Sequence, residues 1–488
     1  MANSKVVLHR LGVRNSPDSI EPSCGVMDVV ENGAVKYRIV IDCGLTQIPL
    51  PGGPRKLHYP DFSLFNDGKK IDAVLITHVH ADHFGAVTKL LPFMSREARV
   101  VMTKGSFTVA MHVLKDNAIG LDKAGQQRVL FENGEISRRA LIIRKPGEVE
   151  ILHGIPALVW PAGHIQGACS FTLKVGKLKI HYAGDRCTHD QPGIKGAPPL
   201  PPEWRPDVFA GTDCTYGADP DSDKRVYRDE WDRGTELAKQ ALLRGSSVAV
   251  PAFALHRSAA VAHMFQQAGI GDFGRLLLDG KAELYTDIME TGEGHWWPGD
   301  EAIDATEVER VSERYMGGAE DGESRYEIAR NGNFTIVTTA GMGGPGGPFT
   351  QWRKFLLSDP DALILFSGYV APDTDGAKIL AAARERDATG NEIEVTFDVL
   401  KRDRTHKGRL IKGGWVKETY PVKCHVAQMR IGGHESRGKT LDWFQELRPQ
   451  AAVLAHGSEA SLASLAGELR GVIPLLHGSH DGPLTLDA

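Results

Sequence analysis

The most informative part of the sequence is the histidine-rich stretch Thr77-His78-Val79-His80-Ala81-Asp82-His83. It directly follows the apolar run Ile71-Asp72-Ala73-Val74-Leu75-Ile76. Because alternate residues of an extended chain face the same side, His78 and His80 point together. Asp82 and His83 then turn back at the end of the predicted strand, so nitrogen and oxygen donors converge as a zinc pair requires. A lone histidine in an apolar setting is usually a core or surface residue, whereas this cluster predicts a metal site.

The rest of the chain predicts a mixed α/β protein. Short β-type runs dominate up to residue 210, with strands expected at 36–41, 71–77, 98–102, 157–160, 171–175 and 178–182. Small and apolar residues recur three and four apart, which is typical of helices, at 84–91, 236–243, 258–268 and 462–469. The Pro-rich stretch 191–206 cannot form ladder hydrogen bonds and predicts an extended surface connection.

Composition and charge exclude several classes of protein. The chain has 488 residues, a formal net charge of −5, and 41% hydrophobic and 24% charged residues, which excludes a wholly disordered, collagenous or disulfide-dense protein. Its length allows two large domains or about three of ordinary size. Its apolar runs are far shorter than the ~20 residues of a membrane helix, and the N-terminus shows no signal-peptide pattern. We therefore expect a cytoplasmic protein without membrane contacts. The six cysteines include no Cys-x-x-Cys pair, so no zinc knuckle or disulfide framework is predicted.

One further motif precedes this stretch and two follow it, in the order of a known family. Asp42 lies in Ile41-Asp42-Cys43-Gly44, His164 in Pro161-Ala162-Gly163-His164, and Asp185 in Tyr182-Ala183-Gly184-Asp185. With the histidine-rich stretch, these motifs resemble the metallo-β-lactamase fold. The resemblance implies a first zinc ion held by His78, His80 and His164, and a second held by Asp82 and His83. Asp185 is then the bridging ligand, and Asp42 orients a ligand or the bridging water.

After residue 185 the chain resembles the β-CASP group of nucleases, to which RNase J and the mRNA 3′-end-processing endonuclease belong. The motifs that carry this resemblance are Thr212-Asp213-Cys214-Thr215-Tyr216-Gly217, Val250-Pro251-Ala252-Phe253-Ala254-Leu255-His256-Arg257, Gly341-Met342, Phe366-Ser367-Gly368-Tyr369, Gly433-His434-Glu435-Ser436 and Ala455-His456-Gly457-Ser458-Glu459. His256 departs from the pattern because a glycine is usual there, and the segment 370–377 lacks the family's phosphate-binding arginine. The resemblance implies an αββα sandwich at 1–217 and 424–488, interrupted by an inserted α/β β-CASP domain at 218–423. The active site is expected in the cleft between them.

The implied reaction is hydrolysis of RNA phosphodiester bonds at two zinc ions, with manganese as the alternative metal. Two metals make hydroxide at neutral pH and offset the charge of a phosphodiester. His434 is the predicted general acid, and Asp213 is expected to hydrogen-bond its far nitrogen and support its imidazolium form. By the resemblance, His456 completes the second zinc site, and a histidine rather than a valine there is associated with RNA rather than DNA.

A basic run at 401–417 bears on the substrate. It carries seven basic residues against one acid, although such runs are often only solvated hairpin faces. We predict that Lys407, Arg409 and Lys412 contact single-stranded RNA. Ser367 is predicted to present its backbone N–H to a phosphate.

Three alternatives stay open on the sequence: a DNA nuclease on the same scaffold, a hydrolase of a lactam or thioester, and a non-catalytic scaffold subunit of an RNA-processing complex. His456 argues against DNA. A large insertion over the cleft suits a threaded polymer better than a small molecule, and the filled ligand positions argue against a scaffold. Endonucleolytic cleavage and processive cleavage from the 5′ end are not distinguished. A homodimer and the role of segment 293–332 are also left open.

Overall fold

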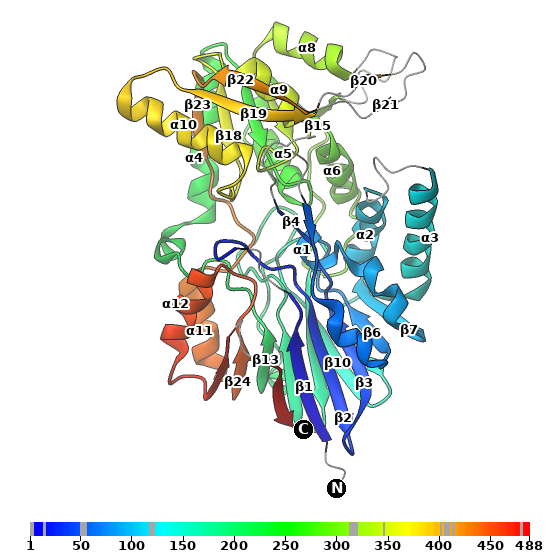
Figure 1. Cartoon of the computed structure of the whole chain (residues 1–488). Coiled ribbons are helices and arrows are strands. Elements are labelled where there is room, and N and C mark those ends of the chain that lie inside the picture. The colour runs from blue at the N-terminus through cyan, green and yellow to red at the C-terminus, as the bar shows by residue number, and fades with distance from the viewer. Residues whose placement is uncertain are drawn as a thin grey trace.

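The computed structural model describes residues 4–12, 16–48, 56–116, 123–311, 321–344, 347–400, 403–404, 410–411, 415–478 and 482–488. They form two lobes, one above the other in Figure 1. We call the part from α4 (Tyr227–Leu243) to β23 (His425–Gln428) the upper lobe, and the strands and helices on either side of it in the sequence the lower lobe. No helix of the described residues is long and apolar enough to span a membrane.

Two seven-stranded sheets make up the centre of the lower lobe. The first contains, in spatial order, β26 (Leu484–Asp487), β1 (Ser4–Arg10), β2 (Gly25–Glu31), β3 (Ala34–Ile41), β6 (Ile71–Leu75), β7 (Met94–Thr103) and β8 (Ala140–Ile143). The second contains β25 (Leu475–His477), β24 (Ala451–Val453), β13 (Val208–Gly211), β12 (Leu178–Tyr182), β11 (Cys169–Val175), β10 (Ile155–Pro161) and β9 (Gly147–Leu152). In each sheet one half pairs antiparallel and the other half, β3-β6-β7-β8 or β12-β13-β24-β25, pairs parallel.

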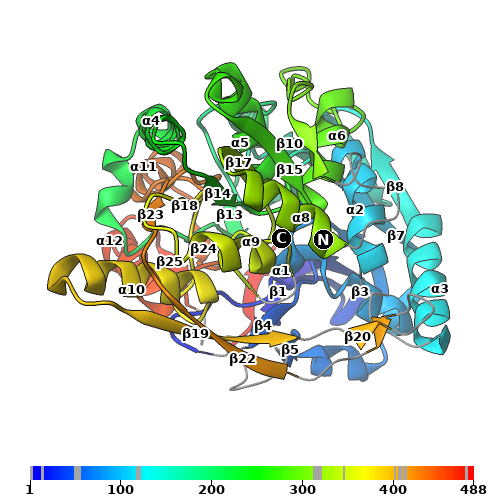
Figure 2. The ribbon, with the colours of Figure 1, turned by 90° about the horizontal axis from the view of Figure 1, so that it is seen from above.

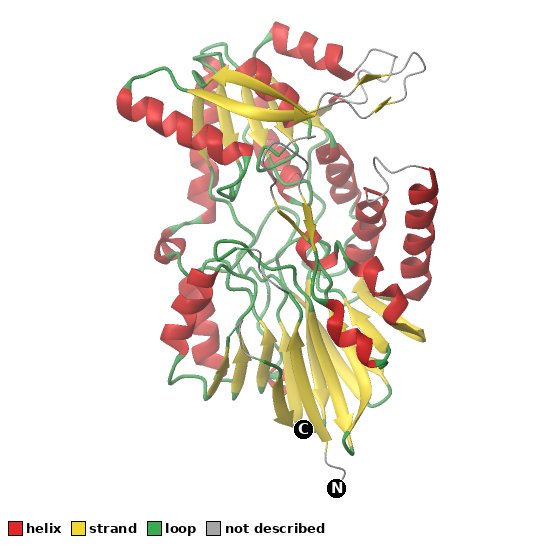
Figure 3. Ribbon diagram, viewed as in Figure 1, coloured by secondary structure: helices red, strands yellow, loops and turns green. Residues whose placement is uncertain are grey.

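The lower lobe has the layer order helix, sheet, sheet, helix (Figure 3). Its central core lies between the sheets and includes Val29, Ile39, Phe171 and Ile180. The outer layers are α1 (Ala81–Phe84), α2 (Lys104–Asp116) and α3 (Lys123–Arg139) against the first sheet, and α11 (Arg437–Leu447) and α12 (Glu459–Leu469) against the second. This arrangement confirms the predicted αββα sandwich.

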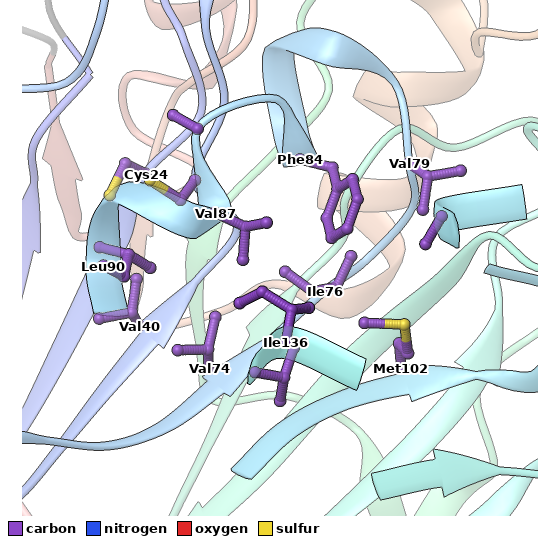
Figure 4. Close-up of a cluster of buried hydrophobic side chains, with 14 of the residues drawn as sticks. Cys24, Val40, Val74, Ile76, Val79, Phe84, Val87, Leu90, Met102 and Ile136 are labelled. Atoms are coloured by element: carbon purple, nitrogen blue, oxygen red, sulfur yellow. The ribbon is translucent and has the colours of Figure 1, made fainter. Parts of the chain in front are cut away.

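Apolar residues within and next to the histidine-rich stretch pack into a buried hydrophobic cluster (Figure 4). Val79 and Phe84 are fully buried beside Ile76 and Val74 of the preceding strand and Met102 of β7. The helix predicted at 84–91 is wrong in type: the chain forms a 3₁₀ helix, η2 (Val87–Phe93), that contains Pro92. Proline lacks the N–H that a continued α-helix would use, which accounts for the short, tighter turn.

The upper lobe is built on a six-stranded parallel sheet. Its spatial order is β16 (Glu309–Arg310), β15 (Arg275–Asp279), β17 (Phe334–Thr338), β14 (Val248–Pro251), β18 (Leu363–Phe366) and β23. Such sheets are covered on both faces: α4, α5 (Arg257–Gln267) and α6 (Lys281–Thr291) pack on one, and α8 (Asp321–Asn331), α9 (Phe349–Leu356) and α10 (Asp375–Thr389) on the other (Figure 2). The confirmed fold class is thus a sandwich with an added α/β unit. The chain passes from the lower sheets to the upper sheet after β13, and it returns after β23, which still pairs with β18. The domain boundaries predicted at 217 and 423 stay predictions.

The remaining elements are short. Antiparallel pairs form between β19 (Glu394–Leu400) and β22 (Trp415–Pro421), β20 (Asp403–Arg404) and β21 (Leu410–Ile411), and β4 (Thr46–Ile48) and β5 (Lys56–His58). Four more 3₁₀ helices are η1 (Phe62–Asp67), η3 (Pro202–Trp204), η4 (Pro220–Lys224) and η5 (Ile270–Asp272). All six cysteines are buried free thiols.

Candidate metal centre

Most of the predicted metal ligands lie between the two lobes, on loops or on the short helix α1, shortly after a strand ends. Asp42 follows β3, the histidine-rich stretch follows β6, and His164 follows β10. Asp185, Asp213 and His456 follow β12, β13 and β24, which are neighbouring parallel strands and therefore end at one edge of their sheet. The fold thus gathers residues separated by hundreds of positions.

Backbone hydrogen bonds hold the turn that carries Asp82 and His83. The carbonyls of Ala81, Asp82 and His83 accept hydrogen bonds from the N–H groups of Leu45 (2.8 Å), Ser23 (2.7 Å) and Cys43 (2.7 Å). A Cβ at Gly44 would collide with the Asp82 carbonyl, so only glycine permits this approach. The loop after β3 therefore sets the orientation of two predicted ligands.

A first group of donors consists of His78, His80, His164 and Asp185. The Nδ1 atom of His80 lies 3.1 Å from Nε2 of His78 and 3.0 Å from Nε2 of His164. Asp185 Oδ2 lies 3.4 Å from both Nε2 atoms. The predicted first set of ligands is therefore brought together, with Asp185 beside it.

A second group consists of Asp82, His83 and His456. The other oxygen of Asp185, Oδ1, lies 3.1 Å from Nε2 of His83 and 3.2 Å from Nε2 of His456. The two oxygens of one carboxylate thus face two different groups of donors, which is the geometry of a bridging ligand.

Hydrogen bonds at the far ring nitrogens leave lone pairs on the inner ones. The Nδ1–H of His164 donates to the carbonyl of Gly433 (2.6 Å), and the Nδ1–H of His83 donates to Asp42 Oδ2 (2.7 Å). Asp42 also accepts hydrogen bonds from the N–H and hydroxyl of Thr77 (2.8 and 2.7 Å), which fix its orientation. A ring that donates through Nδ1 presents Nε2 to a metal, the usual arrangement around zinc.

Burial and neighbouring charge keep the three histidines of the first group neutral. Burial lowers the pKa of His78 and His164 well below the ordinary value, and lowers that of His80 to about 4. At His83 burial also opposes charge, but the Asp185 and Asp42 carboxylates outweigh it and raise the pKa well above its usual range. These carboxylates favour a proton on Nε2 of His83, next to Asp185 Oδ1, and a bound divalent cation would take the place of that proton.

The donor set fits a metal, because one buried polar atom has no other partner. Asp185 is 2% exposed, and among the described residues its Oδ1 has only the imidazole nitrogens of His83 (3.1 Å) and His456 (3.2 Å) beside it. Burying a charged carboxylate oxygen is unfavourable unless a proton or a cation lies between it and its neighbours. The neighbours of Oδ1 are imidazole nitrogens, which can share a metal ion with it. Nitrogen and carboxylate donors in this number suit zinc, and manganese is compatible with the carboxylates.

Asp213 and His434 form an acid pair beside the metal donors, and with Asp185 and His456 they are a third group of donors close enough to hold a metal. Asp213 Oδ2 accepts a hydrogen bond from Nδ1–H of His434 at 2.8 Å, while Asp185 Oδ2 is 4.0 Å from that nitrogen. The His434 side chain is 22% exposed and that of Asp213 is 4% exposed. Burial lowers the pKa of His434, but the charge and hydrogen bond of Asp213 outweigh it and raise the pKa to about 9. His434 is therefore a protonated, accessible imidazolium at neutral pH.

Asp42→Asn tests the role of Asp42 at His83. The substitution should weaken metal binding at the second group by roughly 10- to 100-fold, the usual effect of losing a partner that orients a ligand, because Asp42 no longer holds the proton on Nδ1 of His83. The first group should keep its affinity. Zn²⁺ titration against a chromophoric chelator measures both sites, with Asp442→Asn, exposed on α11, as the control. Unchanged affinity at both sites would contradict this role.

The predicted substrate-binding residues stay predictions, and Ser367 is the only one of them that the structure describes. Lys407, Arg409 and Lys412 lie outside the described residues. Ser367 is buried, and both its N–H (3.3 Å) and its hydroxyl (2.9 Å) donate to the Pro251 carbonyl. A phosphate contact by Ser367 stays a prediction, and it would require these hydrogen bonds to be exchanged.

Several residues at the site carried no sequence signal. The hydroxyl of Ser23 lies 3.3 Å from Nε2 of His83 and 3.5 Å from Nδ1 of His456. Glu21 accepts the backbone N–H of His456 (3.0 Å) and pairs with Arg10. These are single polar residues outside any spaced motif, so only the fold identifies them.

Comparisons with known proteins show what the chain is similar to. Residues 29–185 match the metallo-β-lactamase superfamily. The chain is 25% identical over 434 residues to the probable RNase MJ4 of Methanocaldococcus jannaschii, covering 88% of this chain and 90% of that protein. It is also 25% identical over 452 residues to ribonuclease TTHA0252 of Thermus thermophilus, covering 88% and 89%. A crystal structure of a protein of unknown function from Enterococcus faecalis V583 has the same fold, with a TM-score of 0.53, 11% identity and coverage of 99% and 100%.

Proposed function

We propose that the chain is a zinc-dependent ribonuclease, because residues 29–185 match the metallo-β-lactamase superfamily and most of the chain is similar to proteins named as ribonucleases. Its substrate would be single-stranded RNA, cleaved to products with a 5′-phosphate. The observation that carries the proposal is the convergence of two groups of metal donors on the two oxygens of Asp185, beside the Asp213–His434 pair.

The proposed roles divide between the metal donors and the acid pair. His78, His80 and His164 would hold one zinc ion, Asp82, His83 and His456 the other, with Asp185 between them. Bound divalent metals would activate water at neutral pH and offset the negative charge of the phosphate. The chain's own residues hold the donors in place: Asp42 and Gly433 fix the rings of His83 and His164 through their far nitrogens.

His434 would protonate the leaving oxygen. Its Nδ1 is occupied by Asp213, so Nε2 is the ring nitrogen that can transfer a proton outward. Asp213 would keep the ring in this tautomer and stabilise its charged form, as a buried carboxylate does for a catalytic histidine.

Cleavage of labelled oligonucleotides tests the proposal. Purified protein with Zn²⁺ or Mn²⁺ should cut single-stranded RNA, labelled at the 5′ end or internally, much faster than DNA of the same sequence. The two labels separate endonucleolytic cleavage from cleavage that starts at the 5′ end. Asp185→Ala, purified in parallel, controls for contaminating nuclease. Equal or faster cleavage of DNA would reject the RNA assignment, and cleavage of neither polymer would reject the nuclease.

A further inference from the structure

His256 adopts a backbone conformation that residues with a side chain avoid. Its φ is +64° and its ψ is −53°, and the N–H of Arg257 donates to the Leu255 carbonyl across it at 2.8 Å. This is the rare, strained form of γ-turn. Glycine would adopt this conformation without strain, so a histidine here indicates that its side chain has a role. Residues with strained backbone conformations are concentrated at functional sites.

The His256 ring makes a contact that glycine could not. The side chain is buried at the start of α5, in the upper lobe, and Nε2 lies 3.0 Å from the Pro192 carbonyl of the lower lobe. Burial lowers the pKa of His256 to about 3, so the ring is neutral and its Nε2–H donates to Pro192. The hydrogen bond joins the two lobes.

Gln191, the residue before Pro192, hydrogen-bonds to the backbone of the predicted metal ligand His164. Gln191 is buried, and its side-chain amide donates to the carbonyls of Gly163 (2.8 Å) and His164 (3.0 Å). Arg257, next to His256, reaches the amide oxygen of Gln191 at 3.5 Å. The start of α5 is therefore connected to the backbone of His164 through one short turn.

The ring of His164 is held from the same side. Its Nδ1–H donates to Gly433, which lies in the segment that leaves the upper lobe after β23. Both the backbone and the ring of His164 thus depend on contacts that lead to the upper lobe.

We propose that His256 is a positioning residue, which ties the upper lobe to Pro192 and thereby holds His164 in the geometry that a metal requires. The seating of the upper lobe and the affinity of the first metal site are then coupled. The inference rests on the proposed role of His164 as a ligand.

Three substitutions separate the hydrogen bond from the strain. His256→Gln keeps an N–H donor at the reach of Nε2, whereas His256→Leu fills similar space without one, and both carry the backbone strain. His256→Gly removes the donor and the strain together. Arg448→Gly is the matched control, because Arg448 has a φ of +41° but lies exposed at the end of α11.

Hydrogen exchange in the full-length protein, with and without Zn²⁺, measures the local effect. We expect exchange in segments 161–168 and 188–196 to rise roughly 2- to 10-fold in the Leu and Gly variants, as the loss of one hydrogen bond predicts. The Gln variant and Arg448→Gly should match the unmodified protein. Co²⁺ titration should show weaker binding at the first site in the Leu and Gly variants and unchanged binding at the second.

The outcomes are decisive in both directions. Unchanged exchange and metal affinity in the Leu and Gly variants would overturn the proposal, and so would equal losses in all three variants, because the donor would then not matter. Neither readout needs catalysis. A protein that cleaves no RNA but shows these changes would reject the proposed function alone, whereas active enzyme without them would reject only the role of His256.

Discussion

Replacing His434 by alanine should lower the turnover of RNA by roughly 10²- to 10⁴-fold, the usual contribution of a positioned general acid, while both metals stay bound. His434 donates through Nδ1 to Asp213, so that nitrogen is not available as a ligand. Metal analysis and RNA binding should therefore match the unmodified protein, and the defect should lie in kcat.

Two comparisons isolate the proton transfer. A nitrophenyl phosphodiester has a leaving group that needs no proton, so its hydrolysis by His434→Ala should be spared most of the loss. Asp213→Asn should reduce RNA cleavage by removing the partner that holds the tautomer, and the double variant should be little worse than the worse single one, because the two residues act as one unit.

The pH dependence has a definite sign. The acid must be protonated, so turnover should fall as the pH rises through the pKa of His434, which Asp213 raises to about 9 against the effect of burial. Bound metal cations disfavour the imidazolium, which places this alkaline limb at or below that value. The limb should disappear in His434→Ala. Loss of zinc from this variant would instead identify His434 as a ligand and contradict its assignment as the acid.

Asp185→Ala should abolish cleavage by emptying both metal sites together. Oδ2 faces His78 and His164, and Oδ1 faces His83 and His456, so a single substitution removes a donor from each group. Elemental analysis should find about two equivalents of zinc in the unmodified protein and far less than one per site in the variant.

Single-site variants provide the control for this result. His80→Ala removes a donor from the first group only, and His456→Ala from the second only, so each should lower the occupancy of one site more than the other. Asp185→Asn keeps the volume and should fall between Asp185→Ala and the unmodified protein. An Asp185→Ala protein that retains both metals would show that the carboxylate does not bridge.

Local sequence determined the parts of this site that lie within one turn of chain. His78, His80, Asp82 and His83 follow one another directly after β6, partly on the short helix α1, so their closeness follows from the local sequence, while the loop after β3 orients Asp82 and His83. Val79, in the loop before α1, and Phe84, at the end of α1, are both buried in the core. The order of the later motifs then identified His164, Asp185, Asp213, His434 and His456 through a resemblance, and the structure brings all of them to one place.

Only the tertiary structure decided how these residues are held. The carbonyl of Gly433 sets the tautomer of His164, Ser23 lies against two rings, and Glu21 accepts the N–H of His456; a backbone carbonyl or a single polar side chain leaves no spaced pattern to read. The helix expected at 84–91 became a 3₁₀ turn because packing beneath the loop and Pro92 outweighed periodicity. The hydrogen bond from the His256 ring to Pro192, 64 residues away, likewise joins positions that only the packing of the two lobes brings together.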